Sequence, residues 1–190
     1  MTARKRKPRQ EATWEDLLKV PDDMIGQIVD GELVLMPRPN RPHNQVQSDL
    51  GFLLGTPFRV GDGGPGGWII LVEPRIKFGR NVLVPDLAGW RLPNSPGKDQ
   101  TGPIPRAPDW TCEIISPRTE EDDRGRKLLI YAQHKVAHVW IITPSTRTLE
   151  VLRRKEKAWM LLGIHQGDRK VRAEPFDAVA LNLALLWEHL

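Results

Sequence analysis

Two carboxylates stand inside apolar, strand-like segments in the middle of the chain. Asp86 follows a run of valine, leucine and proline, and Glu113 interrupts the apolar residues 110–115. Because side chains alternate along a strand, Glu113 shares a face with Thr111 and Ile115. A carboxylate in an apolar run is costly to bury without a partner, and a divalent cation would serve as one. For either residue alone, the alternative is a strand-end carboxylate that faces water or pairs with an arginine.

A lysine follows these carboxylates on a predicted helix. Thr119 is the expected N-cap, and the acidic first turn complements the helix dipole (Glu120, Glu121 and Asp122). Lys127 lies one helical turn before Tyr131 and two turns before His134, so the three side chains share one face of the helix. Tyr131 is expected in the core. Lys127 either acts on a substrate or pairs with Asp123 on a solvated helix face.

The order of these motifs along the chain resembles a known nuclease family. The segments that carry the resemblance are residues 28–37, His43, residues 84–86, residues 113–119, Lys127 with Tyr131, and residues 139–142. From Trp14 to the C-terminus the chain resembles the PD-(D/E)xK nuclease superfamily and, more closely, the Uma2 family of restriction-endonuclease-like proteins. The resemblance implies a metal-dependent endonuclease that acts on phosphodiester bonds, with DNA as the expected substrate.

The same resemblance implies a metal site. Asp86 and Glu113 would bind Mg²⁺ or Mn²⁺, with the backbone carbonyl of Ile114 as a further ligand. Such an ion activates water and neutralises charge on the phosphoryl oxygens during hydrolysis. Glu73 is a third candidate ligand, and the alternative is an ion pair with a nearby cation (Arg75 or Lys77).

At one position the chain departs from the superfamily pattern. The residue two after Glu113 should be lysine, but it is Ile115, which cannot stabilise an oxyanion. The Uma2-like pattern supplies the positive charge from the next helix, at Lys127. His43, where a helix begins, could contact phosphate or be structural. The alternative function is a catalytically inactive nuclease-fold module that binds nucleic acid or a partner protein.

Charge and composition limit the expected domain organisation and location of the protein. The formal net charge is +4, but five cations precede the first acidic residue, which leaves −1 for the rest of the 190-residue chain (Arg4, Lys5, Arg6, Lys7 and Arg9). We therefore expect a basic disordered tail at residues 1–12 and one domain at residues 13–190. The single cysteine, Cys112, favours a cytoplasmic protein, and no apolar run is long enough to cross a membrane. A homodimer is expected, because two sites would cut both strands of a duplex.

The elements that must position these residues follow from periodicity and turn signals. The pattern predicts helix, three strands, helix and strand in that order, which matches the αβββαβ core of the resembled superfamily. The resemblance implies an α/β (α+β), restriction-endonuclease-like fold in which a mixed sheet lies between helices. An N-terminal hairpin turns at Asp30-Gly31, and a C-terminal hairpin follows the core. The expected elements are helices at residues 13–18, 43–54 and 119–134, strands at 25–36 (the hairpin), 68–78, 82–90, 110–115 and 138–143, a loop at 93–109, a hairpin of 148–153 with 159–162, and a strand leading into a helix at 178–187.

Overall fold

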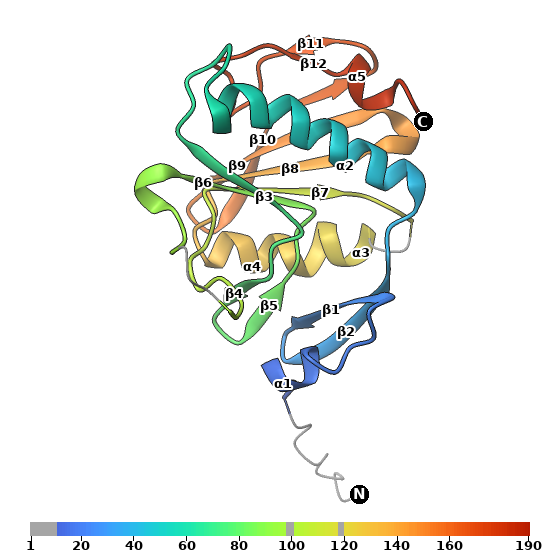
Figure 1. Cartoon of the computed structure of the whole chain (residues 1–190), viewed down its shortest axis with the longest axis vertical. Coiled ribbons are helices and arrows are strands. Elements are labelled where there is room, and N and C mark those ends of the chain that lie inside the picture. Colours follow the sequence, from blue (N-terminus) through green and yellow to red (C-terminus); the bar gives the residue numbers. More distant parts are fainter. Residues whose placement is uncertain (1–10, 98–100, 118–119) are drawn as a thin grey trace, which may run out of the picture.

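The computed structural model describes residues 11–97, 101–117 and 120–190, and its centre is a mixed six-stranded sheet (Figure 1). The strands are β3 (Trp68–Val72), β6 (Leu87–Arg91), β7 (Trp110–Ile114), β8 (His138–Thr143), β9 (Thr148–Lys155) and β10 (Ala158–Gln166). Their order is β10-β9-β8-β7-β6-β3. The central pair β7 and β8 is parallel, and every other neighbouring pair is antiparallel.

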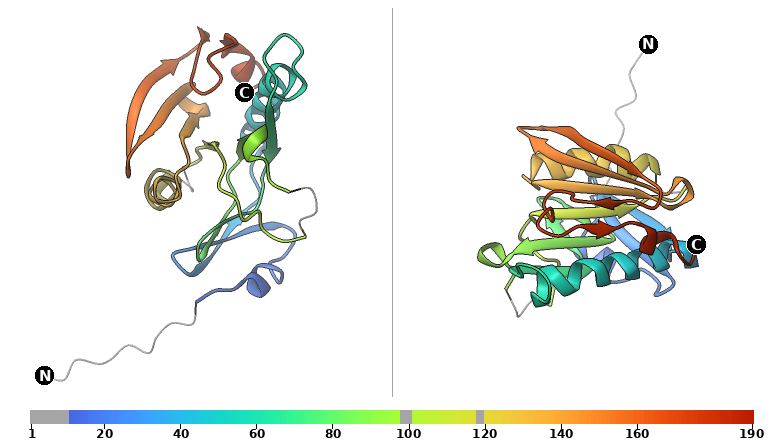
Figure 2. Two further views of the ribbon diagram at one scale, coloured as in Figure 1. Left: turned by 90° about the vertical axis from the view of Figure 1, so that its left-hand side faces the viewer. Right: turned by 90° about the horizontal axis from the view of Figure 1, so that it is seen from above.

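Helices cover both faces of this sheet, as the sequence predicts (Figures 1 and 2). One face carries α2 (Arg41–Leu54), the turn η1 (Gly55–Val60) and α5 (Ala184–Trp187). The other face carries a single helical segment made of α3 (Glu120–Asp122), η3 (Asp123–Lys127) and α4 (Leu128–Gln133). Thr119, the predicted N-cap of this segment, lies outside the described residues. In Figure 1, α2 and α3 both begin at the side of the sheet where β7 ends.

An aromatic cluster fixes α2 against the sheet. Phe176 stands at its centre, and its ring centroid lies between 4.7 and 5.5 Å from those of four other rings (Phe58, Trp68, Trp110 and Trp140). Val46, Leu50 and Leu54 of α2 are buried in the same core, at the helical spacing of one amphipathic face. This packing sets where the first turn of α2 lies relative to the ends of the strands.

A smaller four-stranded sheet lies beside the main one, at the lower end of Figure 1. Its order is β2-β1-β5-β4. The strands are β1 (Met24–Val29), β2 (Glu32–Pro37), β4 (Ile76–Phe78) and β5 (Asn81–Leu83), preceded by α1 (Trp14–Leu17). The predicted turn at Asp30 and Gly31 is confirmed: both have positive φ, as a two-residue hairpin turn needs. Thr13 caps α1 through a reciprocal hydrogen-bonded box with Asp16.

Two predicted strands are each broken in the structure. Residues 68–78 form β3 and β4, and residues 82–90 form β5 and β6, with each pair divided between the two sheets. The breaks coincide with Pro74 and Pro85, which have no N–H to donate to a ladder, and with the left-handed backbone of Glu73 (φ 46°). Because both segments pass from one sheet to the other, Asp86 lies at the junction of the two sheets, directly before β6.

The remaining connections are largely as expected. The segment 93–109 begins with the short turn η2 (Leu92–Asn94) and is tied to β4 by a bridge between Ile104 and Ile76. After β8 come η4 (Pro144–Thr146), the β9–β10 hairpin, and a small sheet of β11 (Lys170–Val171) with β12 (Leu181–Asn182). The predicted strand-then-helix near the C-terminus is confirmed by β12 and α5. Among the described helices, none has the length and apolar character that crossing a bilayer requires.

Candidate functional site

Asp86 is held at the junction of the two sheets by contacts to both carboxylate oxygens. Its Oδ2 accepts a hydrogen bond from the backbone N–H of Ile114 at 2.6 Å. Its Oδ1 lies 3.1 Å from Nε2 of His43 in the first turn of α2. The side chain of Gln47, one turn further along α2, donates to the backbone carbonyl of Asp86 at 3.1 Å. The end of β7 and the start of α2 therefore fix this carboxylate.

Glu113 lies in β7 on the face covered by α4, as alternation along the strand predicts. Lys127 Nζ lies 3.0 Å from its Oε2, and the hydroxyl of Tyr131 donates to its Oε1 at 2.5 Å. Lys127 and Tyr131 share a helix face because they are four residues apart. Tyr131 is buried in the core as expected, and it is in addition a hydrogen-bond donor to the candidate site.

Asp123 belongs to the same cluster, although the sequence interpretation placed it on a solvated surface. Its Oδ1 lies 2.7 Å from Lys127 Nζ, and the side chains of Asp123, Lys127 and Glu113 are each no more than 3% exposed. The predicted i,i+4 pair is thus present but buried, and Lys127 contacts Glu113 as well. The positions 123, 127 and 131 form one helical stripe, which was the available signal for Asp123. The helix widens to a π-turn here, and such turns are frequent at functional sites.

Burial and neighbouring charges shift the pKa values within this cluster. Burial raises the pKa of Glu113, and Asp123 and Asp86 raise it further, against the opposing effect of Lys127. For Lys127, burial alone would lower the pKa, but Glu113 and Asp123 outweigh it and hold the pKa above its usual range. Lys127 is therefore a permanent cation at neutral pH. Burial also raises the pKa of Tyr131, so its hydroxyl keeps the proton that it donates.

His43 and Glu73 occupy the side of the site nearest α2. Burial lowers the pKa of His43, but the contact with Asp86 outweighs it, and the net pKa is raised. The backbone N–H of His43 donates to the N-cap of α2, Asn40, at 3.1 Å. The ion pair of Glu73 is with Arg38, at 3.4 Å; the predicted partners, Arg75 and Lys77, were wrong. The fold brings Arg38 here because the loop from β2 to α2 passes the β3–β4 break.

These residues meet at one cavity of about 490 Å³. All the predicted site residues line it: Asp86, Glu113, Lys127, Ile114, Glu73 and His43, together with Asp123. Four carboxyl groups line it (Glu73, Asp86, Glu113 and Asp123), together with the side chains of Lys127 and Arg38. Hard divalent cations bind carboxylate oxygens and need only one or two of them when waters complete the shell. The donor set fits such an ion, although no three His, Cys, Asp or Glu side chains of the described residues form a ready-made cage.

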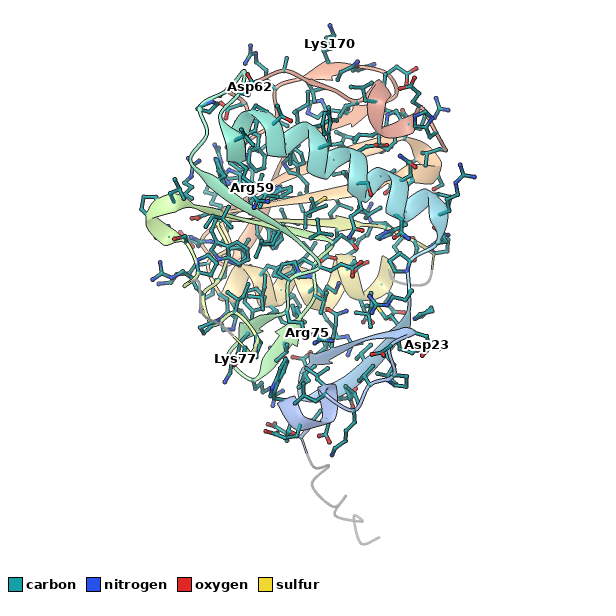
Figure 3. The ribbon with its side chains drawn as sticks, viewed as in Figure 1. Asp23, Arg59, Asp62, Arg75, Lys77 and Lys170 are labelled. Atoms are coloured by element: carbon teal, nitrogen blue, oxygen red, sulfur yellow. The ribbon has the colours of Figure 1, made fainter. Side chains whose placement is uncertain are left out.

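The charged surface outside the cavity has no single sign. Figure 3 labels Asp62 and Lys170 near the end formed by η1 and β11, and Asp23, Arg75 and Lys77 toward the four-stranded sheet. Opposite charges therefore occur at both ends. This agrees with the net charge close to zero that the chain has beyond its first nine residues.

Two comparisons with known proteins both find similarity to proteins described as nucleases. The Uma2 family, described as "Putative restriction endonuclease", matches residues 14–185. A solved structure described as "a putative nuclease belonging to DUF820 from Anabaena variabilis" has a TM-score of 0.72 and 22% sequence identity. The match covers 93% of this chain and 98% of that one. At this identity the likeness shows the fold alone, and it confirms the predicted nuclease-like fold. No curated protein matches the chain significantly.

Proposed function

Because this chain belongs to the Uma2 family, we propose that it is a metal-dependent endonuclease that hydrolyses phosphodiester bonds in DNA. The observation that supports this most is the common cavity of Asp86, Glu113 and Lys127, which come from three separate segments of the chain. Phosphodiester hydrolysis needs charge neutralisation at the phosphoryl oxygens and an activated water, and this cavity offers anionic oxygen ligands beside a fixed cation.

Asp86 and Glu113 would hold Mg²⁺ or Mn²⁺, with the carbonyl of Ile114 as a further ligand and Glu73 as an additional candidate. When bound, such an ion lowers the pKa of water and neutralises charge on the phosphate. The protein contributes orientation: the backbone N–H of Ile114 fixes Asp86, and the Tyr131 hydroxyl fixes Glu113. His43 holds the second oxygen of Asp86 from the α2 side.

Lys127 takes the role of the lysine that is missing at Ile115. Its raised pKa keeps it protonated, so it stabilises negative charge on the substrate and does not act as a general base. Asp123 positions the Lys127 ammonium from within the same helix, at 2.7 Å. Ile115 is buried in the core on the α4 side and contributes packing only.

A cleavage assay on supercoiled and linear DNA, with Mg²⁺, Mn²⁺ or EDTA, tests this function. Lys127→Ala should lower the rate about a hundredfold to a thousandfold, as removal of one such electrostatic group typically does. The matched control is Arg126→Ala, which removes the neighbouring cation from a pair with Asp122 at the surface. Circular dichroism of each variant establishes that it is folded. Full activity of Lys127→Ala would remove this residue from the mechanism.

A second candidate, a catalytically inactive module that binds nucleic acid, is favoured by one specific observation. Each carboxylate oxygen of Asp86 and Glu113 already has a partner within the protein (His43, Ile114, Tyr131 and Lys127). Such a network is satisfied without an ion. DNA binding in a gel-shift assay that is unchanged by EDTA, with no cleavage in Mg²⁺ or Mn²⁺, would support this candidate over the nuclease.

A further inference from the structure

The candidate catalytic groups lie at the bottom of a recess. The side chains of Glu113, Asp123 and Lys127 are at most 3% exposed, and those of His43 and Asp86 are 11% and 15% exposed. A phosphate can reach them only by entering the cavity. In a regular duplex, two paired and stacked strands hold the phosphates in place. These phosphates therefore cannot enter the recess and reach the candidate catalytic groups at its floor.

One wall of the recess is apolar and comes from the N-terminal hairpin. Ile25 of β1 and its cross-strand partner Met36 of β2 share the face that lines it, and Val84 adds to it from the end of β5. The first turn of α2 also lines the recess, with the polar side chains of its cap and of His43. An apolar lining with a few placed polar groups is the usual arrangement of sites for small organic ligands, whose volumes are roughly 300–1,000 Å³. The observed 490 Å³ is of this class.

Among the described residues that line the recess, the lysine and arginine side chains give little attraction for a duplex backbone. They are Lys127 at the floor and Arg38, which is paired with Glu73. Proteins that bind continuous duplexes neutralise several phosphates with basic side chains. Here one wall of the recess is apolar, which suits the base and sugar of one nucleotide better than a row of phosphates.

We propose, resting on the nuclease function above, that the substrate presents an unpaired nucleotide to this recess. The base and sugar lie against Ile25 and Met36, and the scissile phosphate lies toward Asp86 and Glu113. Single-stranded DNA meets this requirement directly, and a nucleotide in a duplex meets it only after leaving the stack, which costs free energy. A single strand also needs no second site for an opposite strand, so this substrate class does not depend on a dimer.

The first test compares cleavage of one labelled oligonucleotide in Mg²⁺ or Mn²⁺ when it is free, fully paired, or paired with an internal unpaired bulge. Cleavage of the free strand and at the bulge should exceed cleavage of the full duplex on the order of a hundredfold, the cost of extruding a paired base. Equal rates on all three would overturn the substrate proposal and leave the nuclease function standing. Cleavage of none would overturn the nuclease function and the substrate proposal with it.

The second test uses two apolar residues of the same strand. Met36 lines the recess beside Ile25 and is half-buried, whereas Leu33, on the opposite face of β2, does not line it and is 39% exposed. Both truncations should leave the fold intact because both side chains are already partly in water. Met36→Ala should raise KM for the single strand about five- to tenfold through lost apolar contact, and Leu33→Ala should leave it unchanged. Equal KM values for the two variants, or an effect of Leu33→Ala alone, would overturn the placement of the nucleotide against this wall.

Discussion

The buried charges around Lys127 give a prediction whose size follows from the structure. Lys127→Met removes the ammonium but keeps a side chain of similar length, and it leaves Glu113 and Asp123 without the cation that both contact. Breaking a buried ion pair by removing one partner costs about 3–5 kcal/mol of stability. The matched control is Arg126→Met, since Arg126 pairs with Asp122 where the side chains are 39% and 27% exposed, and such pairs contribute about 0–1 kcal/mol.

The cost should depend on pH, because a stranded carboxylate can take up a proton. Burial and the neighbouring carboxylates raise the pKa of Glu113 to about 8 in the folded wild type, although Lys127 lowers it. Without Lys127 this pKa rises further. The contribution of a group whose folded pKa is raised is complete below its unfolded pKa, about 4.3, and is lost as the pH rises through the folded pKa. The wild type and the variant therefore lose it alike up to about pH 8, and above that pH the variant loses more.

Urea unfolding of the wild type and both variants at pH 5, 7 and 9 measures this dependence. The loss of unfolding free energy in Lys127→Met should be nearly the same at pH 5 and pH 7 and larger at pH 9 by about 1.4 kcal/mol, with an unchanged m-value. Arg126→Met should show a small loss that is the same at each pH. A loss for Lys127→Met that does not change with pH would refute the reasoning, because the carboxylates would then have another partner or access to water.

Three further predictions use other parts of the molecule. Millimolar Mg²⁺ or Mn²⁺ should raise the melting temperature of the wild type and leave that of Asp86→Asn/Glu113→Gln unchanged; no shift in the wild type would count against the metal site. Burial lowers the pKa of His138 against the effect of Glu174, so the contribution of this histidine to stability should be lost as the pH falls through its folded pKa. Unfolding free energies measured from pH 7 downward should therefore decline less steeply below pH 6.5 in His138→Gln than in the wild type. Deleting residues 1–10 removes five cations and should flatten the salt dependence of DNA affinity while the protein still folds, and a truncated protein that fails to fold would contradict the proposed domain boundary.

The sequence alone determined the features that depend on local periodicity and turn chemistry. The hairpin at Asp30-Gly31, the apolar stripe of α2 and the face of β7 that carries Glu113 all follow from neighbouring residues, and the structure agrees with each. The family was also recognisable, because the motifs keep their order along the chain. These signals need no knowledge of which segments meet in space.

Only the tertiary structure decided which strand belongs to which sheet and which charges meet. Residues 68–78 read as one strand, and the crossing at Glu73 and Pro74 depends on the pairing of β3 with β6 and of β5 with the distant strand β1. The partner of Glu73 is Arg38, brought near by the same crossing, and local spacing had suggested Arg75 or Lys77. Long-range pairing is invisible to a local pattern because it depends on which partners the rest of the fold makes available.

Asp123 shows the physical reason most directly. An acidic residue in the first turns of a helix interacts favourably with the helix dipole whichever face it occupies. The sequence therefore favours a position in water, where the charge keeps its solvation. Its burial is tolerated only because Lys127 lies 2.7 Å away, in a cavity that β7 and Glu113 close from the other side. The sequence determined that a lysine and carboxylates were present, and the packing of the helix on the sheet decided that they share one buried site.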